Sequence, residues 1–212
     1  MSRIQDERSA ETRKRLLDAT VDCLFERGYA GTTTAEIASR AGFSKGAQLH
    51  HFPTKEKLVI SALEYLFELR LAASSDPVAI AKLPKDRNQR LVAIVDMLVP
   101  VYETKIFYAW LELVVASRTD LALRSAVRQV SKNYTKRVLE IWKELFGSPG
   151  DEASAFRMLD RIVNGQFAVI ALGRILNGGE NDDEQETEET VEVIKEIGVS
   201  LLAKTKRARR KS

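Results

Sequence analysis

Apolar residues recur along the chain at the three- and four-residue intervals that place them on one face of an α-helix. Between positions 12 and 27, Leu17, Val21 and Leu24 form such a stripe, and Gly28 follows where a left-handed helix cap would fall. No stretch shows the two-residue alternation of a strand flanked by hairpin turns. The pattern therefore predicts an all-α protein.

Short helices are predicted next. Thr33 and Glu36 have the spacing of a capping box, in which each side chain bonds to the other residue's unpaired backbone amide. Gly42 interrupts this first short helix, and Ser44 is placed to cap a second one that ends near residue 51. Thr54 then begins a longer helix that runs to about residue 73.

Longer helices are predicted in the rest of the chain, separated by residues that favour turns. They span 86–99, 103–117, 120–146, 152–176 and 184–204, with breaks at Pro100, 119–120, 147–150 and 177–179. We therefore expect an N-terminal three-helix head within residues 10–70 and a C-terminal helical-bundle body at 75–204. The basic tail, residues 205–212, is expected to be disordered.

Composition narrows the class of protein. The chain has 212 residues, which suits one domain or one domain with a small module. Its single cysteine, Cys23, excludes an intrachain disulfide, and its two histidines are too few to complete a four-ligand zinc site. No run of 18 apolar residues occurs, and residues 1–11 lack the apolar block of a signal peptide. We expect a cytoplasmic protein without a membrane partner.

Neither the net charge nor any catalytic motif indicates a function. The net charge is +3, and residues 1–60 carry nearly balanced acids and bases, so charge alone does not indicate a nucleic-acid partner. The sequence contains no phosphate-binding glycine loop, HExxH or GxSxG pattern. We therefore expect no catalytic residues, no metal and no cofactor, and hence no enzyme.

Residues 33–52 carry the most informative pattern. A helix of about two turns, a turn containing Gly42 and a second short helix make up a helix-turn-helix. Glycine suits the turn because it adopts a positive φ at little cost. The second helix begins with small or polar residues, as a helix inserted into the major groove requires. This segment predicts DNA binding.

On these residues the chain resembles the TetR/AcrR family of transcriptional regulators over positions 10–70. The matching residues are Thr33, Thr34, Ile37, Ala38, Ala41, Gly42, Ser44, Gly46, Ala47, His51, Phe52, Lys55 and Leu58. The resemblance implies that the second short helix is the recognition helix and that Thr34 and Lys55 reach phosphates. The implied DNA-binding residues are Thr33, Thr34, Ser44, Lys45, Gly46, Ala47, Gln48, Leu49, His50 and Lys55.

Two positions depart from the family pattern, which usually has an apolar residue and then a tyrosine where this chain has Gln48 and Leu49. Leu49 lacks the tyrosine hydroxyl but suits contact with a thymine methyl group. Gln48 either turns outward to pair with adenine or stays inward, where it needs a buried partner.

The two histidines and the cysteine have ordinary structural explanations. His50 and His51 are adjacent, so they point about 100° apart on a helix, and no acid or cysteine is spaced to join them in a metal site. We expect His51 to pack on the core of the head and His50 to face DNA. Cys23 lies among apolar neighbours, which favours a buried small hydrophobe over a redox sensor.

In the body, the resemblance implies a pocket for a small-molecule effector. The candidates are aromatic or polar residues on the long helices, although any one aromatic residue on an amphipathic helix is more often explained by core filling. They are Tyr102, Phe107, Trp110, Asn133, Arg137, Asn164 and Phe167.

The helix at 152–176 has two apolar stripes, so we expect it to be buried on both sides. One stripe holds Met158, Ile162, Gly165, Val169, Leu172 and Leu176, and the other holds Phe156, Leu159, Val163, Phe167 and Ile170. One stripe can close the subunit's own core, and the other needs a partner. The last helix adds Val193, Ile194, Ile197 and Leu201. The resemblance likewise implies a homodimer through the last two long helices.

We therefore expect a homodimeric repressor that binds a palindromic DNA operator and is released by a small molecule. The helix from Thr54 to about residue 73 is expected to be the only segment linking head and body. The alternative is a helical-bundle enzyme or carrier that acts on a hydrophobic small molecule. A third possibility is a regulator of the same fold that responds to a protein partner.

Overall fold

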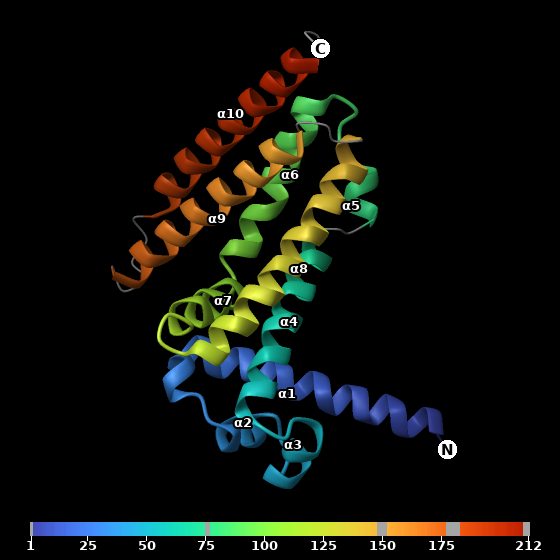
Figure 1. Ribbon diagram of the computed structural model, residues 1–212, viewed down its shortest axis with the longest axis vertical. Coiled ribbons are helices and arrows are strands. Elements are labelled where there is room, and N and C mark those ends of the chain that lie inside the picture. The colour runs from blue at the N-terminus through green and yellow to red at the C-terminus, as the bar shows by residue number, and fades with distance from the viewer. Residues whose placement is uncertain (1, 75–76, 148–151, 177–182, 210–212) are drawn as a thin grey trace. The chain divides into compact units, whose positions relative to one another are not determined.

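The computed structural model describes residues 2–74, 77–147, 152–176 and 183–209, and every regular element within these ranges is a helix (Figure 1). The prediction of an all-α protein is confirmed. No helix within the same ranges is long and apolar enough to cross a membrane.

The helices fall into two compact units. The first comprises residues 1–70 and 104–133, and the second comprises residues 71–103 and 134–212. The first unit holds α1 (Ser2–Gly31), α2 (Thr34–Arg40), α3 (Lys45–His51), α7 (Lys105–Ala116) and most of α4 (Lys55–Ser74). The second holds α5 (Pro77–Ala81), α6 (Arg87–Tyr102), α9 (Glu152–Leu176) and α10 (Asp183–Arg209). Helix α8 (Leu121–Phe146) contributes residues to both units.

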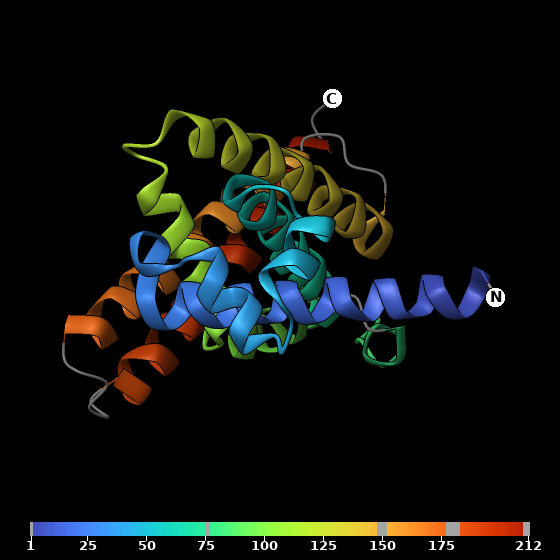
Figure 2. The same cartoon turned by 90° about the horizontal axis from the view of Figure 1, so that it is seen from below.

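The first unit is organised around α1, which packs against α7 and α2, while α2 packs against α3 (Figure 2). Its core brings together apolar residues from α1, α2 and α4 and the segments that flank α3. These are Leu16, Leu17, Ala19, Cys23, Ile37, Ala41, Phe52, Leu58 and Ala62. Burial of this common core holds short helices that would be marginal in isolation.

The second unit is a bundle of long helices in which α10 packs along α9 and α6, as Figure 1 shows. An aromatic cluster joins the C-terminal end of α8 to the N-terminal end of α9. The ring of Trp142 on α8 stacks on Phe156 of α9 at 4.8 Å, and Phe146 lies 5.3 Å from each of them. Aromatic burial therefore provides much of the apolar contact in this unit.

Several helix ends differ from the sequence prediction. α1 begins at Ser2 rather than near residue 12. The prediction missed its first turns because residues 5–11 are exposed and carry no apolar stripe. Pro100 lies inside α6 instead of ending it, since a proline in the last turn removes only one backbone hydrogen bond. α10 continues to Arg209, so residues 205–209 of the basic tail are helical rather than disordered. The short helix α5 was not predicted.

The grouping of segments also differs from the expected head and body. Residues 104–133 join the first unit, whereas the sequence placed them in the body. α8 as well as α4 therefore continues from one unit into the other, and α4 is not the only link. The expected breaks at 148–150 and 177–179, and residues 210–212, lie outside the described part of the chain.

Candidate nucleic-acid interface and effector cavity

The helix-turn-helix is fixed by local bonds between side chains and backbone. Thr33 Oγ1 accepts a hydrogen bond from the Glu36 amide at 3.2 Å, and Ser44 Oγ accepts one from the Ala47 amide at 3.2 Å, so both residues cap their helices as predicted. Gly42 forms the turn with a φ of 73°. The Glu36 carboxylate pairs with Arg27 at 3.0 Å, which takes it away from the reciprocal half of a capping box.

Arginine side chains tie α2 and its turn to α1. Arg40 makes two bonds of 2.6 Å to the carboxylate of Glu26, and this guanidinium holds the pKa of Glu26 below its usual value. Arg15 donates to the Ala41 carbonyl oxygen at 2.8 Å while its guanidinium lies over the Phe43 ring. These contacts fix the first of the two short helices against the rest of the head.

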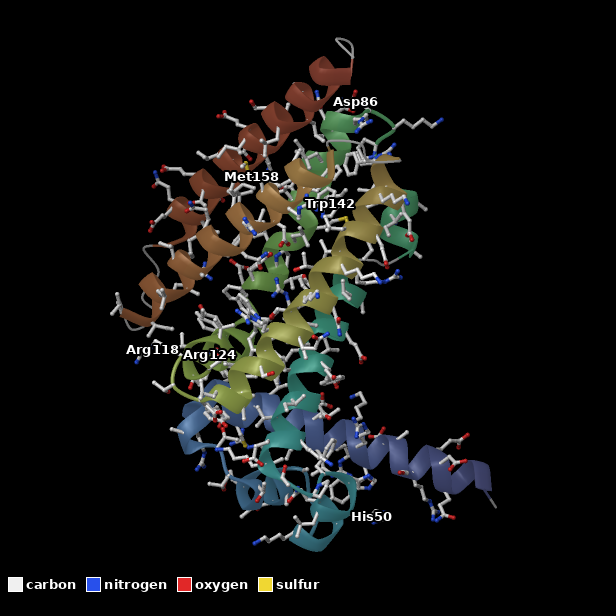
Figure 3. The ribbon with its side chains drawn as sticks, in the orientation of Figure 1. His50, Asp86, Arg118, Arg124, Trp142 and Met158 are labelled. Atoms are coloured by element: carbon white, nitrogen blue, oxygen red, sulfur yellow. The ribbon has the colours of Figure 1, made fainter. Side chains whose placement is uncertain are left out.

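The outer face of α3 carries most of the predicted DNA-binding residues. Ser44, Lys45, Gly46, Leu49 and His50 are exposed, and Figure 3 shows His50 on this helix. Ala47 is half-buried. Thr33 is exposed and Thr34 half-buried at the start of α2. The structure thus presents a continuous polar and apolar strip along one side of a single helix.

Gln48 is the exception, because its side chain is 0% exposed. Its Nε2 donates to the Phe52 carbonyl oxygen at 2.6 Å, so the inward alternative, with a buried partner, is the one the structure adopts. Gln48 Oε1 is buried without a hydrogen-bond partner among the described residues. The outward alternative, in which Gln48 pairs with adenine, is therefore wrong for this conformation.

Lys55, the first residue of α4, is half-buried, and its ammonium group is already engaged. Its Nζ donates to the Tyr29 carbonyl oxygen at 2.9 Å and lies 4.5 Å from the centre of the Tyr29 ring. An ammonium has three donors, so two remain for a phosphate.

The histidines and the cysteine lie as expected. His50 is exposed and His51 half-buried, and burial lowers the pKa of His51. Cys23 is 0% exposed, and burial raises the pKa of its thiol, which makes it a poor nucleophile. Within the described ranges, no group of three or more histidine, cysteine or acidic residues is arranged to hold a metal ion.

Three of the seven predicted effector residues come together in the second unit. The Tyr102 ring stacks on Phe167 at 4.3 Å, and its hydroxyl lies 3.3 Å from Asn164 Oδ1. Asn164 Nδ2 in turn donates to the backbone oxygen of Asp160 at 2.7 Å and to its carboxylate at 3.1 Å. This group links α6 to α9 through one aromatic stack and a short polar chain.

The other four lie elsewhere. Phe107 and Trp110 belong to the first unit, where their rings are 5.3 Å apart and Arg70 lies over both. Asn133 and Arg137 are exposed on α8, bonded to Gln129 and Glu140 respectively. Their polar side chains follow the outer face of an amphipathic helix, and neither residue lines the cavity described next.

A cavity of about 50 Å³ in the second unit lies next to the Tyr102 group. α6, α8 and α9 line it with aliphatic side chains, three aromatic rings and one carboxylate, that of Asp160. The lining residues are Ile94, Val95, Leu98, Tyr102, Tyr134, Val138, Ile141, Trp142, Leu145, Leu159, Asp160 and Val163. Effector pockets are usually several times larger, so a ligand must push these side chains apart to enter.

Sequence reasoning found only Tyr102 among the residues that line this cavity. The missed residues are mostly aliphatic and lie on the inner faces of three amphipathic helices, where they cannot be distinguished from core residues by pattern. Among the missed residues, only Asp160 had a sequence pattern that could have indicated the cavity, because it is an acidic residue between the apolar residues Leu159 and Val163.

The two stripes of α9 differ as predicted. Phe156, Leu159 and Val163 are buried with the rest of their stripe, at 2%, 2% and 4% exposure. Met158, Val169 and Leu172 of the other stripe are exposed by 53%, 61% and 48%. A groove of about 270 Å³ between α9 and α10 continues this face and includes Ile162, Val193 and Ile197.

Comparison with known proteins identifies the class. The family profile described as "Bacterial regulatory proteins, tetR family" matches residues 16–62, which contain the whole helix-turn-helix. The transcriptional regulator CymR of Pseudomonas putida is 34% identical over 148 residues, which are 70% of this chain and 71% of CymR. The chain therefore belongs to the TetR family and is a helix-turn-helix transcriptional regulator.

Two further proteins are similar to this chain. The transcriptional repressor KstR of Mycolicibacterium smegmatis is 38% identical over 80 residues, or 38% of this chain and 39% of KstR. The crystal structure of the multidrug binding protein EbrR in complex with imidazole has the same fold. Its TM-score is 0.58 at 20% identity, and the match covers 87% of this chain and 93% of EbrR.

Proposed function

We propose that the protein is a homodimeric repressor that occupies a palindromic operator and leaves it when a small molecule binds the second unit. The observation that best supports DNA binding is the exposed face of α3. The side chains of Lys45, Leu49 and His50 are exposed there, whereas that of Gln48 is buried. A helix that presents such a strip reads base edges in the major groove. A regulator of this kind acts in the cytoplasm.

Phosphate contacts are assigned to residues beside α3. Thr33 and Thr34 lie at the start of α2, Ser44 at the start of α3, and Lys55 at the start of α4. Contacts of this type position the protein without reading sequence. Gly46 and Ala47 add no side-chain donors and let the backbone of α3 approach the groove closely.

The exposed apolar stripe of α9, continued by Val193 on α10, supports the dimer. An apolar face of this length is uncommon on a monomer and suits a twofold partner that buries the same residues. A dimer places two copies of α3 on half-sites about 34–36 Å apart, or a multiple of that spacing. The operator is then an inverted repeat.

The cavity supports the small-molecule part. Its lining is apolar apart from Asp160 and the tyrosine hydroxyls, so the proposed effector has a compact apolar body and one polar group. EbrR, with the same fold, is named for binding several drugs. A ligand that opens the cavity displaces the part of α8 that lines it, and a coupling of about 1–3 kcal/mol changes operator affinity about 5–150-fold.

The test is selection of bound sequences from a random pool of DNA duplexes with the full chain. The expected product is an inverted repeat whose half-sites are one helical turn apart or a multiple of it. Enrichment of a single half-site would contradict the dimer, and absence of any enriched sequence would contradict operator recognition through α3.

A further inference from the structure

Tyr29 lies in the last turn of α1, directly after the kink at Gly28, and its amide, carbonyl oxygen and hydroxyl are all bonded to residues far away in the sequence. Its amide donates to Glu112 Oε1 at 2.7 Å, and its carbonyl oxygen accepts from Lys55 Nζ at 2.9 Å. Its hydroxyl donates to Asp120 Oδ2 at 3.1 Å. One residue thus joins the end of α1 to α4, to α7 and to the residue that precedes α8.

The backbone at this bend is shaped to admit the carboxylate of Glu112. Gly28 has a φ of 67°, and a Cβ at that position would lie 2.9 Å from Glu112 Oε1. Any other residue at position 28 would therefore be strained and would crowd the carboxylate. The charge-assisted bond from the Tyr29 amide to Glu112 fixes the direction of the last turn of α1, which leads to α2.

Asp120 and Lys55, which bond to the hydroxyl and the carbonyl oxygen of Tyr29, have defined roles of their own. Asp120 Oδ1 accepts from the Leu123 amide at 2.9 Å, so this carboxylate caps α8 while its second oxygen holds the Tyr29 hydroxyl. Lys55 is the residue assigned above to a phosphate. Its bond to the Tyr29 carbonyl oxygen holds the ammonium group against the last turn of α1.

We propose that Glu112 and Tyr29 are positioning residues for DNA binding, which hold α2, α3 and Lys55 in the arrangement that fits the groove. Neither touches DNA. They act by fixing the joint between α1 and α2, and through Lys55 they fix one phosphate contact relative to the recognition helix. This inference rests on the DNA-contact surface proposed above.

The main experiment compares Glu112→Ala with Glu112→Gln on a duplex recovered by the selection. The alanine variant loses the acceptor for the Tyr29 amide, and its operator Kd is expected to rise about tenfold, the lower end of the loss for a charge-assisted bond. Glutamine keeps an acceptor oxygen, so its Kd is expected to stay within about twofold of the wild type. Glu140→Ala, which removes an exposed carboxylate on α8, is the control and should leave the Kd unchanged.

A double-mutant cycle separates positioning from general stability. If Glu112 acts partly through Lys55, the cost of Glu112→Ala should fall to less than about threefold in a Lys55→Ala background. Additive losses would overturn the proposal, and so would equal losses for Glu112→Ala and Glu112→Gln. If Lys45→Ala weakens operator binding while Glu112→Ala does not, the positioning role of Glu112 is wrong, and the proposed DNA-contact surface is supported. If neither variant matters, the surface itself is misassigned.

A milder pair covers the case in which Glu112→Ala does not fold. Tyr29→Phe removes only the bond to Asp120, and Tyr65→Phe removes a similar bond to Asp18 of 2.7 Å on another face of the head. Melting temperatures should fall by similar amounts, whereas only Tyr29→Phe should weaken operator binding, by about threefold. Equal operator affinities for the two variants would contradict the proposal.

Discussion

The two units of this protein are stabilised in different ways. In the first unit, the short helices pack on a common apolar core and are oriented by polar bonds between residues far apart in the sequence, such as Tyr29 with Glu112. In the second, long helices meet largely through apolar contact, as where the ring of Trp142 on α8 stacks on Phe156 of α9. Directional bonds fix orientation, which a DNA-reading surface needs. Apolar contact tolerates rearrangement, which a cavity that must open needs.

The largest effect is expected from disrupting the apolar face of the second unit. This face is proposed to form the dimer that lets two copies of the first unit bind DNA together. Val169→Glu places a charge in the exposed stripe of α9 and should give a folded monomer in sedimentation at micromolar concentration. Loss of the second half-site should reduce operator affinity by about 10²–10⁴-fold. The control is Val78→Glu on α5, which is equally exposed, at 62%, and should remain dimeric. If the wild-type protein is already monomeric, the proposed dimer is wrong.

The next prediction sharpens the contrast in stability. Phe156 is 2% exposed, and Phe156→Ala should lower the free energy of unfolding by about 3–5 kcal/mol, measured in urea. Phe25 in the first unit is 49% exposed, so Phe25→Ala should cost much less. Similar losses for the two variants would show that burial of the ring does not set its contribution to stability.

Lys45→Ala tests directional contact in the first unit. If Lys45 reads a guanine, its removal should cost about 1–3 kcal/mol of operator affinity and relax the preference at one base pair. Lys55→Ala should instead weaken binding to every sequence and reduce the salt slope by about one phosphate. Binding titrations over a range of salt concentrations, on the operator and on one-base variants, distinguish the two. Wild-type behaviour of both variants would show that α3 is not the recognition helix.

A smaller effect is expected at the two positions where the sequence departs from its family. Leu49 is 42% exposed and suits a thymine methyl group, so Leu49→Ala should cost about 1 kcal/mol on the operator. Replacing that thymine by uracil should weaken the wild type but not the variant. Gln48→Ala should destabilise the head without changing the selected sequence, since Gln48 faces the core. A changed sequence preference would show that Gln48 turns outward on DNA.

The smallest effect concerns Tyr29, whose pKa burial and the Asp120 carboxylate raise to about 12. A raised pKa stabilises the folded state fully below pH 10, the ordinary value, and this contribution is lost as the pH rises toward 12. Titration of tyrosine absorbance in the native protein should show a late component that Tyr29→Phe removes. Its persistence in that variant would assign the shift to another tyrosine.

The sequence predicted the first unit better than the second, and the reason is physical. Thr33, Gly42 and Ser44 act on their immediate neighbours, so their roles follow from spacing alone. The bonds of Tyr29 to residues 83 and 91 positions away have no local signature. For the same reason, residues 104–133 could not be assigned to the first unit. The cavity of the second unit depends on which inner faces of α6, α8 and α9 meet, and Phe107 and Trp110 show that an aromatic residue alone does not indicate it.

The inward position of Gln48 limits how much sequence information one recognition helix can carry. With Gln48 turned away, Lys45, Leu49 and His50 are the large side chains left on the outer face of α3. Three base pairs specify about one site in 64, whereas a genome offers about 10⁶ or more competing positions. A twofold repeat specifies roughly one site in 4,000, which still leaves hundreds of competitors. Sequence-dependent bending and narrowing of the operator between its half-sites can supply further discrimination.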